Sequence, residues 1–377
     1  MSDRGTKRTA DMMSGDSQPV TEYSESALDI LPPLSVLGAT LRPGISIFPD
    51  SPNRNILDGT DSFIEVGYGS SSSILHKPRR ETVVKKRHPY YSIVGGLVSA
   101  VVKETGMTME VHQVFDTYES GSNIPIKVPG NVKAITDWVT LLDTGSHSYG
   151  LPHPFCILTP AIEMDMIYPL PKAVGRALIQ QFHPKLAGST MDPYVVEEIL
   201  NQQGNQHCLV QPCLGLNTHS RKPGDFSLGD LELSLSDMRD IGMDSSSLAQ
   251  AIGQAFSLLH YRCWLYGEGV QFAFGTSPTK KPFQHTSYTV DLYLFDFGDC
   301  DRITSREDTH TLSLDIVKEM LEPNIRKFIP SPLKSPTLFK IFKDAYIDHA
   351  TKALDNKCTT SHNVMKHYER RAARQFL

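Results

Sequence analysis

The sequence has few of the features that mark zinc-binding, secreted or membrane proteins. Its six cysteines are scattered over 377 residues, and the closest pair, Cys208 and Cys213, has no second pair to complete a zinc site. No run of residues approaches the ~18 apolar residues of a membrane span. Residues 1–30 are rich in Ser, Asp, Lys and Arg and lack the apolar core of a signal peptide. We therefore expect a reduced, cytoplasmic protein with neither a metal site nor a membrane partner.

The charge balance argues against a protein that coats nucleic acid without sequence preference, because the formal net charge is −5. One segment departs from this balance. The run HKPRRETVVKKRH, residues 76–88, holds six Lys and Arg in thirteen residues. Such a run is a solvated strand and loop in one interpretation and a phosphate or RNA contact surface in the other. The second interpretation assigns RNA binding to Lys77, Arg79, Arg80, Lys86 and Arg87.

The order of expected elements changes along the chain from strands to helices. We expect a disordered polar tail at 1–27, a strand-rich part at 28–165, a helical part at 166–355 and an exposed basic tail at 356–377. The stretch FIEVGYGSSSSI predicts two strands around a turn at Gly67 and Gly69, and a further strand ends at Lys85. The spacing of apolar residues over 108–118 predicts a helix that carries Glu110.

The helical part contains one strongly amphipathic segment. Five apolar residues between 244 and 264 recur on one face of a helix that leads into His260, namely Leu248, Ile252, Ala255, Phe256 and Leu259. We also expect helices over 172–184 and over 192–200, the latter with Asp192 as N-cap. After these helices the stretch VDLYLFDFGDCDRI predicts a buried strand that runs into Asp296-Phe297-Gly298.

This order of elements predicts an α+β fold of the two-lobed protein-kinase type. In such a fold Lys85 neutralises phosphate oxygens, a helix glutamate orients that lysine, and the aspartate of Asp-Phe-Gly carries magnesium. We therefore expect an ion pair between Lys85 and Glu110, with Asp296 nearby.

The segment expected to form the catalytic loop argues against ordinary phosphoryl transfer. Kinases place an aspartate two residues after the loop histidine and an asparagine further on. Here Tyr261 and Arg262 follow His260, and no asparagine stands before Phe274. The nearest acid is Glu268.

Several stretches resemble a fungal protein family of kinase-like fold, often labelled zinc-finger-protein-like, some members of which are arginine-containing cyclodipeptide synthases. The resemblance covers residues 63–354 and rests on FIEVGYGSSSSI with TVVKKR, on EVHQVF, CILTPAIEMDMIYPLP and HCLVQPCLG, and on FSLGDLELSLSDMRDIGMD, LLHYRCW, GVQFAFG and LYLFDFGDCDRI. The chain departs from the family at Gly269 and Gln271, where the family motif Asp-Val-Glu has carboxylates.

The resemblance implies a tRNA-dependent aminoacyltransferase of secondary metabolism, without a cofactor, that joins arginine from arginyl-tRNA to a second amino acid as a diketopiperazine. This chemistry needs a general base, an acid for the guanidinium and a cationic surface for tRNA. We assign catalysis to His260, Glu268 and Asp296 and substrate binding to Lys85, Glu110 and Asp299, with Asp301 close by. Two alternatives stay open: a noncatalytic, pseudokinase-like binding protein, in which His260 is a packed core residue, and a small-molecule phosphotransferase.

Overall fold

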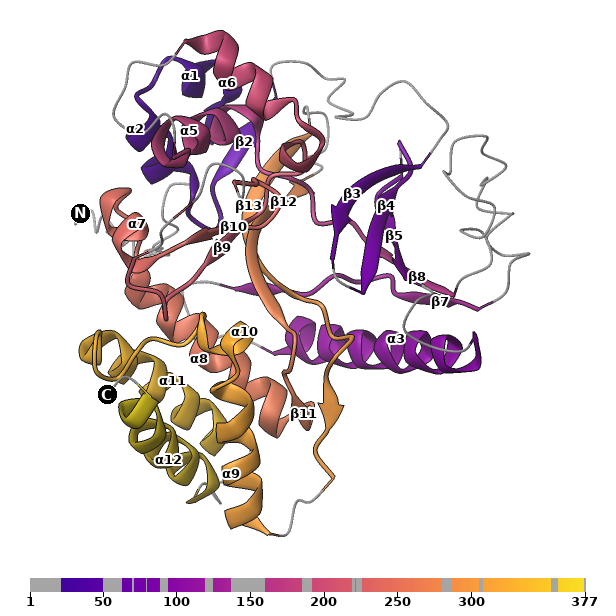
Figure 1. Ribbon diagram of the computed structural model, residues 1–377, viewed down its shortest axis with the longest axis vertical. Coiled ribbons are helices and arrows are strands. Elements are labelled where there is room, and N and C mark those ends of the chain that lie inside the picture. Colours follow the sequence, from indigo (N-terminus) through magenta and orange to yellow (C-terminus); the bar gives the residue numbers. More distant parts are fainter. Residues whose placement is uncertain are drawn as a thin grey trace, which may run out of the picture.

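The computed structural model describes residues 22–49, 63–69, 71–78, 80–88, 94–118, 125–136, 160–184, 192–218, 221, 226–279, 286–304, 308–353 and 359–375. They form a mixed α+β architecture with a small sheet, a large curled sheet and a helical part (Figure 1). Within the described ranges, no helix is both long enough and apolar enough to cross a membrane.

The small sheet is an antiparallel five-stranded sheet. Its strands lie in the order β3 (Ile64–Tyr68), β4 (Ser72–His76), β5 (Thr82–Arg87), β8 (Ala161–Asp165) and β7 (Lys133–Ile135). The expected hairpin is confirmed, because the backbone N–H of Gly69 donates to the carbonyl of Ser72 at 2.8 Å and closes the turn. Gly67 lies at a bulge of β3, where an added Cβ would come within 3.2 Å of Ile74.

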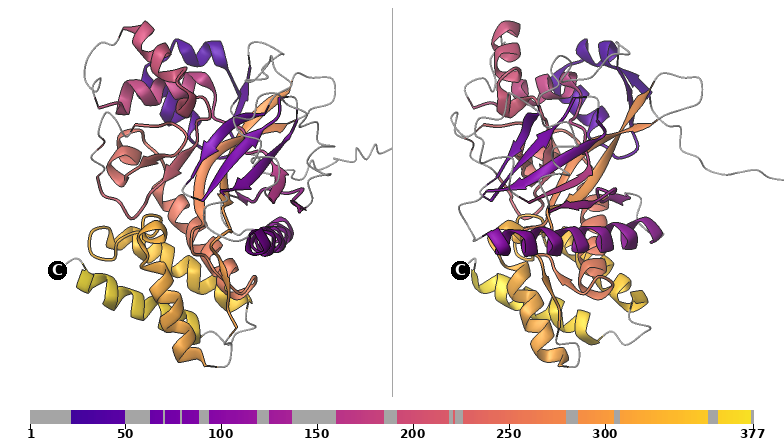
Figure 2. Two further views of the ribbon diagram at one scale, coloured as in Figure 1. Left: turned by 45° about the vertical axis from the view of Figure 1, so that its right-hand side comes forward. Right: turned by 90° about the vertical axis from the view of Figure 1, so that its right-hand side faces the viewer.

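Helix α3 (Val94–Thr117) runs along the small sheet (Figures 1 and 2). It extends the helix expected over 108–118 by about four turns toward its N-terminus. Its apolar contacts with the sheet are few. Val101 packs with Val132 and Ile162 in a cluster of three buried residues, whereas the main core lies under the large sheet and the helical part. Polar contacts of α3 add to these apolar contacts in holding the helix against its sheet.

The large sheet has a long antiparallel hairpin at its centre, formed by β12 (Gln271–Thr279) and β13 (Ser287–Phe295). The other strands are short: β1 (Glu22–Ser24), β2 (Ser46–Phe48), β6 (Ile126–Lys127), β9 (Val210–Pro212) and β10 (Leu231–Leu233). A separate two-stranded sheet pairs β11 (Leu265–Tyr266) with β14 (Asp301–Arg302). The turn between β13 and β14 carries Asp296 to the edge of the large sheet that faces the small sheet.

The helices divide into two groups around the large sheet (Figure 1). At one end lie α1 (Glu25–Asp29), α2 (Pro33–Thr40), α5 (Lys172–Phe182), α6 (Pro193–Leu200) and the short η3 (Gln203–Asn205). The helical part comprises α7 (Leu235–Asp240), α8 (Ser245–Tyr261), α9 (Thr309–Met320), α10 (Pro323–Arg326), α11 (Pro336–Ala353) and α12 (Thr359–Gln375). The expected helices over 172–184, 192–200 and 244–264 are confirmed as α5, α6 and α8. Asp192 caps α6, and all five apolar residues of the α8 stripe are buried.

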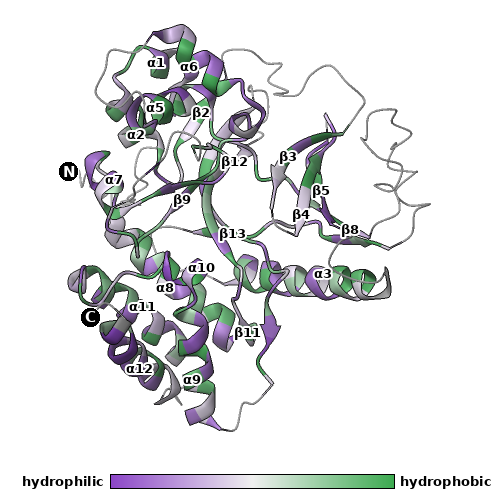
Figure 3. Cartoon of the chain, viewed as in Figure 1, coloured by the Kyte–Doolittle hydropathy of each residue, from purple (hydrophilic) through white to green (hydrophobic). Residues whose placement is uncertain are grey.

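Two expected boundaries are wrong. Residues 22–27 belong to β1 and α1 rather than to a tail, and α1 and α2 pack on α5 instead of joining the strand-rich part. The C-terminal segment forms α12, a helix that is largely hydrophilic in Figure 3. Its inner side nevertheless buries Val364, Met365, Tyr368 and Ala372 against the core. The high content of Lys and Arg concealed this narrow apolar stripe.

Candidate functional site

A cavity of about 810 Å³ separates the small sheet from the large sheet, and we refer to it as the cleft. Its size falls within the range of small-molecule sites. The small sheet and α3 contribute Gly67, Lys85 and Glu104 to its walls, and the large sheet contributes Gln271 and Asp296.

Lys85 is the central cation of the cleft. It lies on β5 with only 7% of its surface exposed, and its Nζ is 2.6 Å from Oε1 of Glu104 and 2.5 Å from Oδ1 of Asp296. Burial alone would lower the pKa of the ammonium group, but the adjacent carboxylates of Asp296 and Glu104 outweigh this effect and raise the pKa. Lys85 therefore stays charged at neutral pH and binds two elements together.

Glu104, rather than Glu110, is the helix partner of Lys85, and the expected Lys85–Glu110 ion pair is wrong. Glu104 is 2% exposed, and its Oε2 also accepts from Arg87 at 2.8 Å. Glu110 instead pairs with Arg302 of β14 at 2.5 Å, where both side chains are partly exposed. The two glutamates are six positions apart, which gives a net rotation of about 240° around the helix axis, so the two side chains lie on different faces of α3.

Asp296 follows β13 in a left-handed backbone conformation, with φ at +69°. Such a conformation is uncommon for residues other than glycine and is concentrated at functional sites. The side chain is 36% exposed and faces the cleft. Gly298 is tightly enclosed two residues later, since an added Cβ would lie 2.5 Å from Nη2 of Arg87 and 2.8 Å from Oε2 of Glu104. Asp-Phe-Gly is thus fixed against the ion pairs of the small sheet and α3.

The opposite wall of the cleft carries a polar network that the sequence did not indicate. Nζ of Lys327 donates to Oε1 of Gln211 at 2.7 Å and to Oε1 of Glu232 at 2.8 Å. Nε2 of Gln211 donates to Oε1 of Gln271 at 3.2 Å. These residues come from β9, β10, β12 and the segment after α10. A motif within one stretch of the sequence therefore does not predict that they lie together.

The cleft is acidic overall. Among the described residues, six carboxylates line it against three cationic side chains, which gives these residues a formal charge of −3. The carboxylates are Glu65, Glu104, Asp165, Asp230, Glu232 and Asp296, and the cations are Lys85, Arg221 and Lys327. His207 adds no positive charge at neutral pH, because burial and the neighbouring His76 lower its pKa to about 4. This balance favours a cationic ligand over an anionic one.

His260 lies outside the cleft. It is fully buried in α8, where its Nδ1 is 2.8 Å from the hydroxyl of Tyr346 and its Nε2 is 3.2 Å from Oε2 of Glu319. The structure thus places it as a hydrogen-bonded core residue and does not bring it to Asp296. The sequence contains a signal for this burial, because His260 directly follows the apolar stripe of α8.

The other expected acids do not line the cleft either. Glu268 lies on the loop between β11 and β12, and its pKa is raised by burial and by the charges of Glu319, Asp301 and Glu322. Asp299 approaches that loop, since an added Cβ on Gly269 would lie 3.1 Å from Cβ of Asp299. Asp301 is exposed and pairs with Lys103 at 2.6 Å. Of these acids that follow β13, Asp296 lines the cleft, whereas Asp299 and Asp301 do not.

The basic run is divided by the geometry of the small sheet. Arg87 lies on the α3 side, 16% exposed, and bonds to Glu104 and to the carbonyl of Gly298, so its guanidinium group is engaged within the protein. Lys77, Arg80 and Lys86 remain at least partly exposed, and Arg79 lies outside the described residues. The alternation of side chains along β5 accounts for the separation of Lys86 from Arg87.

The described thiols and acids offer neither a nucleophile nor a preformed metal site. Burial raises the pKa of Cys208 and of Cys263 to about 12 and also raises those of Cys213 and Cys300. These thiols are therefore protonated and unreactive at neutral pH. Among the residues that the structure describes, no group of three or more His, Cys, Asp or Glu side chains is placed to hold a metal ion.

Comparisons with known proteins give little further information about the function of the chain. No protein-family model and no curated protein matches the chain. One similar solved structure is that of a microcompartment-associated aminopropanol kinase, which aligns over 84% of this chain and 94% of its own length at 11% identity, with a TM-score of 0.19. At that score the likeness carries no argument about fold or function.

Proposed function

We propose that the chain binds arginine, delivered on tRNA, in the cleft and joins it to a second amino acid as a cyclic dipeptide. The acidity of the cleft carries this proposal. A guanidinium group is a planar cation with five N–H donors, and carboxylates such as Asp296 bind it through two parallel hydrogen bonds. A free nucleoside triphosphate, in contrast, would be repelled by a cavity of formal charge −3.

In this proposal the fold is of the two-lobed kinase type, with the small sheet and α3 as one lobe. The Lys85–Glu104 ion pair holds α3 to its sheet, and Oδ1 of Asp296 accepts from Lys85 with one lone pair, so that Oδ1 and Oδ2 can both accept from the guanidinium. The amine of the second amino acid, which is itself esterified to tRNA, attacks the ester carbonyl of arginyl-tRNA, and the ribose oxygen leaves with a proton. The α-amine of the arginyl residue then attacks the second ester, the second ribose oxygen leaves with a proton, and the ring closes. The amine must lose its proton before the attack, so a general base is required.

The partners in this proposal are arginyl-tRNA and a second amino acid, in the cytoplasm. Phosphate contacts to the tRNA come from the other described residues of the basic run, which are at least partly exposed: Lys77 and Arg80 between β4 and β5, and Lys86 on β5.

Calorimetry with arginine methyl ester tests the cation preference of the cleft, because this ester resembles the aminoacyl end of arginyl-tRNA. Citrulline methyl ester is the matched control, since it has a similar shape and an uncharged urea group. We expect the arginine ester alone to bind, and Asp296→Asn to weaken its binding at least tenfold. Equal binding of the two esters would contradict the proposal.

A small-molecule phosphotransferase is the second candidate, and the Lys85–Glu104–Asp296 triad favours it. In kinases these three residue types hold the phosphates and magnesium. Magnesium is often held by one or two carboxylates together with substrate phosphates, so a preformed metal cluster is not required. Titration with ATP separates the candidates: tight binding that requires magnesium supports the phosphotransferase, and no binding supports the synthase.

A further inference from the structure

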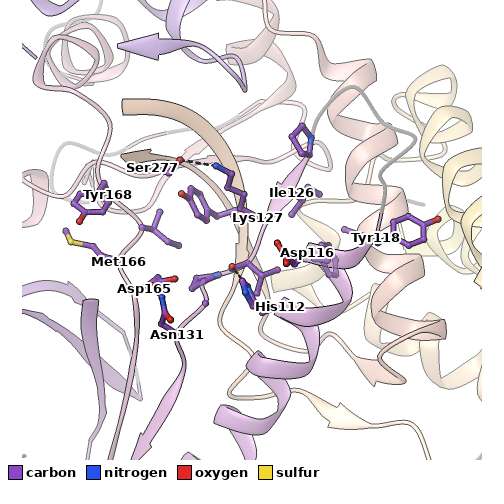
Figure 4. A pocket seen from close by; sticks show the side chains of 18 of the residues that line it. His112, Asp116, Tyr118, Ile126, Lys127, Asn131, Asp165, Met166, Tyr168 and Ser277 are labelled. Carbon is purple, nitrogen blue, oxygen red and sulfur yellow. Dashed lines mark hydrogen bonds between the residues drawn. The ribbon is translucent and has the colours of Figure 1, made fainter. Parts of the chain in front are cut away.

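A second cavity of about 760 Å³ lies between α3, the segment that joins β6 to β7, the end of β8 and the helix α8 (Figure 4). Asp165 lines both this cavity and the cleft, together with Pro129 and Ile167. The two cavities therefore meet at the end of β8. His112 and Gly130 line only the second cavity.

His112 and Asp165 approach each other across Gly130. An added Cβ on Gly130 would lie 3.0 Å from Nε2 of His112 and 3.0 Å from Oδ2 of Asp165. Because Gly130 has no side chain, His112 and Asp165 approach it closely from two sides, and both line the second cavity, where one ligand group can contact them together. Figure 4 shows His112 on its helix, with Asp165 and Asn131 beside each other on the neighbouring segments.

Each of the two groups is held in a defined orientation. Nδ1 of His112 lies 2.9 Å from the carbonyl of Val128 and donates to it, so that Nε2 of the neutral ring carries the lone pair. Nδ2 of Asn131 donates to Oδ1 of Asp165 at 2.7 Å, and Oδ2 is the oxygen that faces His112. Asn131 makes this contact from a left-handed conformation, with φ at +51°. Strain of this kind is retained when surrounding structure enforces it, often at binding sites.

The remaining walls indicate what kind of ligand fits. Lys127 is paired with the buried Asp291 at 2.7 Å, so its charge is already compensated. The carboxylates of Glu81, Asp116 and Asp165 line the cavity, which disfavours anionic ligands. Apolar and aromatic groups cover much of the rest, including Phe115, Ile126, Met166, Leu258 and Tyr293.

We infer that this cavity binds a compound with a primary ammonium group and an apolar side chain. Oδ2 of Asp165 accepts a hydrogen bond from the ammonium group. Nε2 of His112 takes one of its protons, so that an N–H bond breaks, the imidazole becomes an imidazolium ion beside Asp165, and the amine keeps its lone pair for attack. The identification of this compound with the second amino acid rests on the proposed function, in which His112 is the required base.

Binding of L-phenylalanine methyl ester, measured by calorimetry, tests the site. N-acetyl-L-phenylalanine methyl ester lacks the ammonium group and is the matched control ligand. We expect the free amine to bind and the acetylated ester not to bind. Gly130→Ala fills the space between His112 and Asp165, and Asp165→Asn removes the charge, so each should weaken binding at least tenfold. Unchanged binding in a Gly130→Ala variant with the wild-type melting temperature would overturn the inference.

A second arm separates this inference from the proposed function. The cleft variant Asp296→Asn should bind the phenylalanine ester as the wild type does, because Asp296 lies outside the second cavity. If binding depends on Gly130 and Asp165 but the protein forms no cyclic dipeptide, the amine site is supported and the proposed synthase function is contradicted. If the Gly130→Ala and His112→Gln variants form the dipeptide at the wild-type rate, the synthase function is supported and the assignment of His112 as the base is contradicted.

Discussion

Nζ of Lys85 lies 2.5 Å from Oδ1 of Asp296, although 211 residues separate the two in the sequence. The same Nζ lies 2.6 Å from Oε1 of Glu104. One buried cation therefore joins β5, helix α3 and the turn after β13, at the place where the apolar contacts of α3 with its sheet are few.

Removal of this cation should destabilise the protein strongly. Lys85→Met leaves Glu104 and Asp296 without it, and breaking a buried ion pair in this way costs about 3 kcal/mol. Urea unfolding measures the change. The matched control is Glu110→Gln, which breaks the partly exposed pair with Arg302 and should cost less than ~1 kcal/mol. If both variants lose equal stability, Lys85 does not have the structural role described.

Gly298 and Gly106 offer a matched pair of glycine substitutions. Gly298→Ala places a methyl group 2.5 Å from Nη2 of Arg87 and 2.8 Å from Oε2 of Glu104, so we expect a lower melting temperature and weaker binding of arginine methyl ester. Gly106→Ala, in open space on α3, should stabilise the protein by up to ~1 kcal/mol. A Gly298→Ala variant as stable as the wild type would show that the turn after β13 is not held by these contacts.

How far the sequence predicts this site depends on the residue. Lys85 and Asp296 are predictable because Lys85 lies on a strand of recognisable pattern and Asp296 directly follows one. Glu104 is not predicted, because the apolar spacing indicates a helix only from Thr108 onward, after a stretch that contains Gly95, Gly96 and Gly106. A signal was present, since Glu104 falls on the helical stripe of Leu97, Val101, Thr108 and Val111, all buried, and Glu110 does not.

His207 makes stability depend on pH. Its pKa is lowered to about 4 in the folded protein from an ordinary value of 6.5. As pH falls from 6.5 to 4, His207 takes up a proton in the unfolded chain but stays neutral in the folded protein. The free energy of unfolding should therefore decrease over this range. His207→Gln should flatten this decrease by at most ~1.4 kcal/mol per pH unit. Parallel curves of urea stability against pH for the two proteins would refute the assignment.

The exposed part of the basic run should bind tRNA. Changing Lys77, Arg80 and Lys86 to Glu should weaken binding of tRNA in a filter assay and reduce its dependence on salt, because fewer phosphate contacts release fewer counterions. The control changes Arg370 and Arg371, which are exposed on α12, to Glu. Equal loss of affinity in the two proteins would indicate a nonspecific effect of net charge.

The second cavity and the far wall of the cleft could not be predicted from local patterns. Asp165, His112 and Asn131 come from β8, α3 and the segment between β6 and β7, and only the folded chain brings them to Gly130. The same holds for Lys327 and Glu232 in the cleft. Helices such as α5 and α8 were predictable because their burial follows a local period, whereas these polar contacts depend on pairing between distant segments.

Synthesis of a cyclic dipeptide by the purified protein tests the central claim most directly. The protein is supplied with arginyl-tRNA and the other aminoacyl-tRNAs, and the products are analysed by mass spectrometry. We predict an arginine-containing cyclic dipeptide that is lost in Asp296→Asn, a change that removes the charge while asparagine tolerates the left-handed backbone at this position. A folded wild-type protein that forms no such compound, or an Asp296→Asn variant that forms it undiminished, would contradict the account.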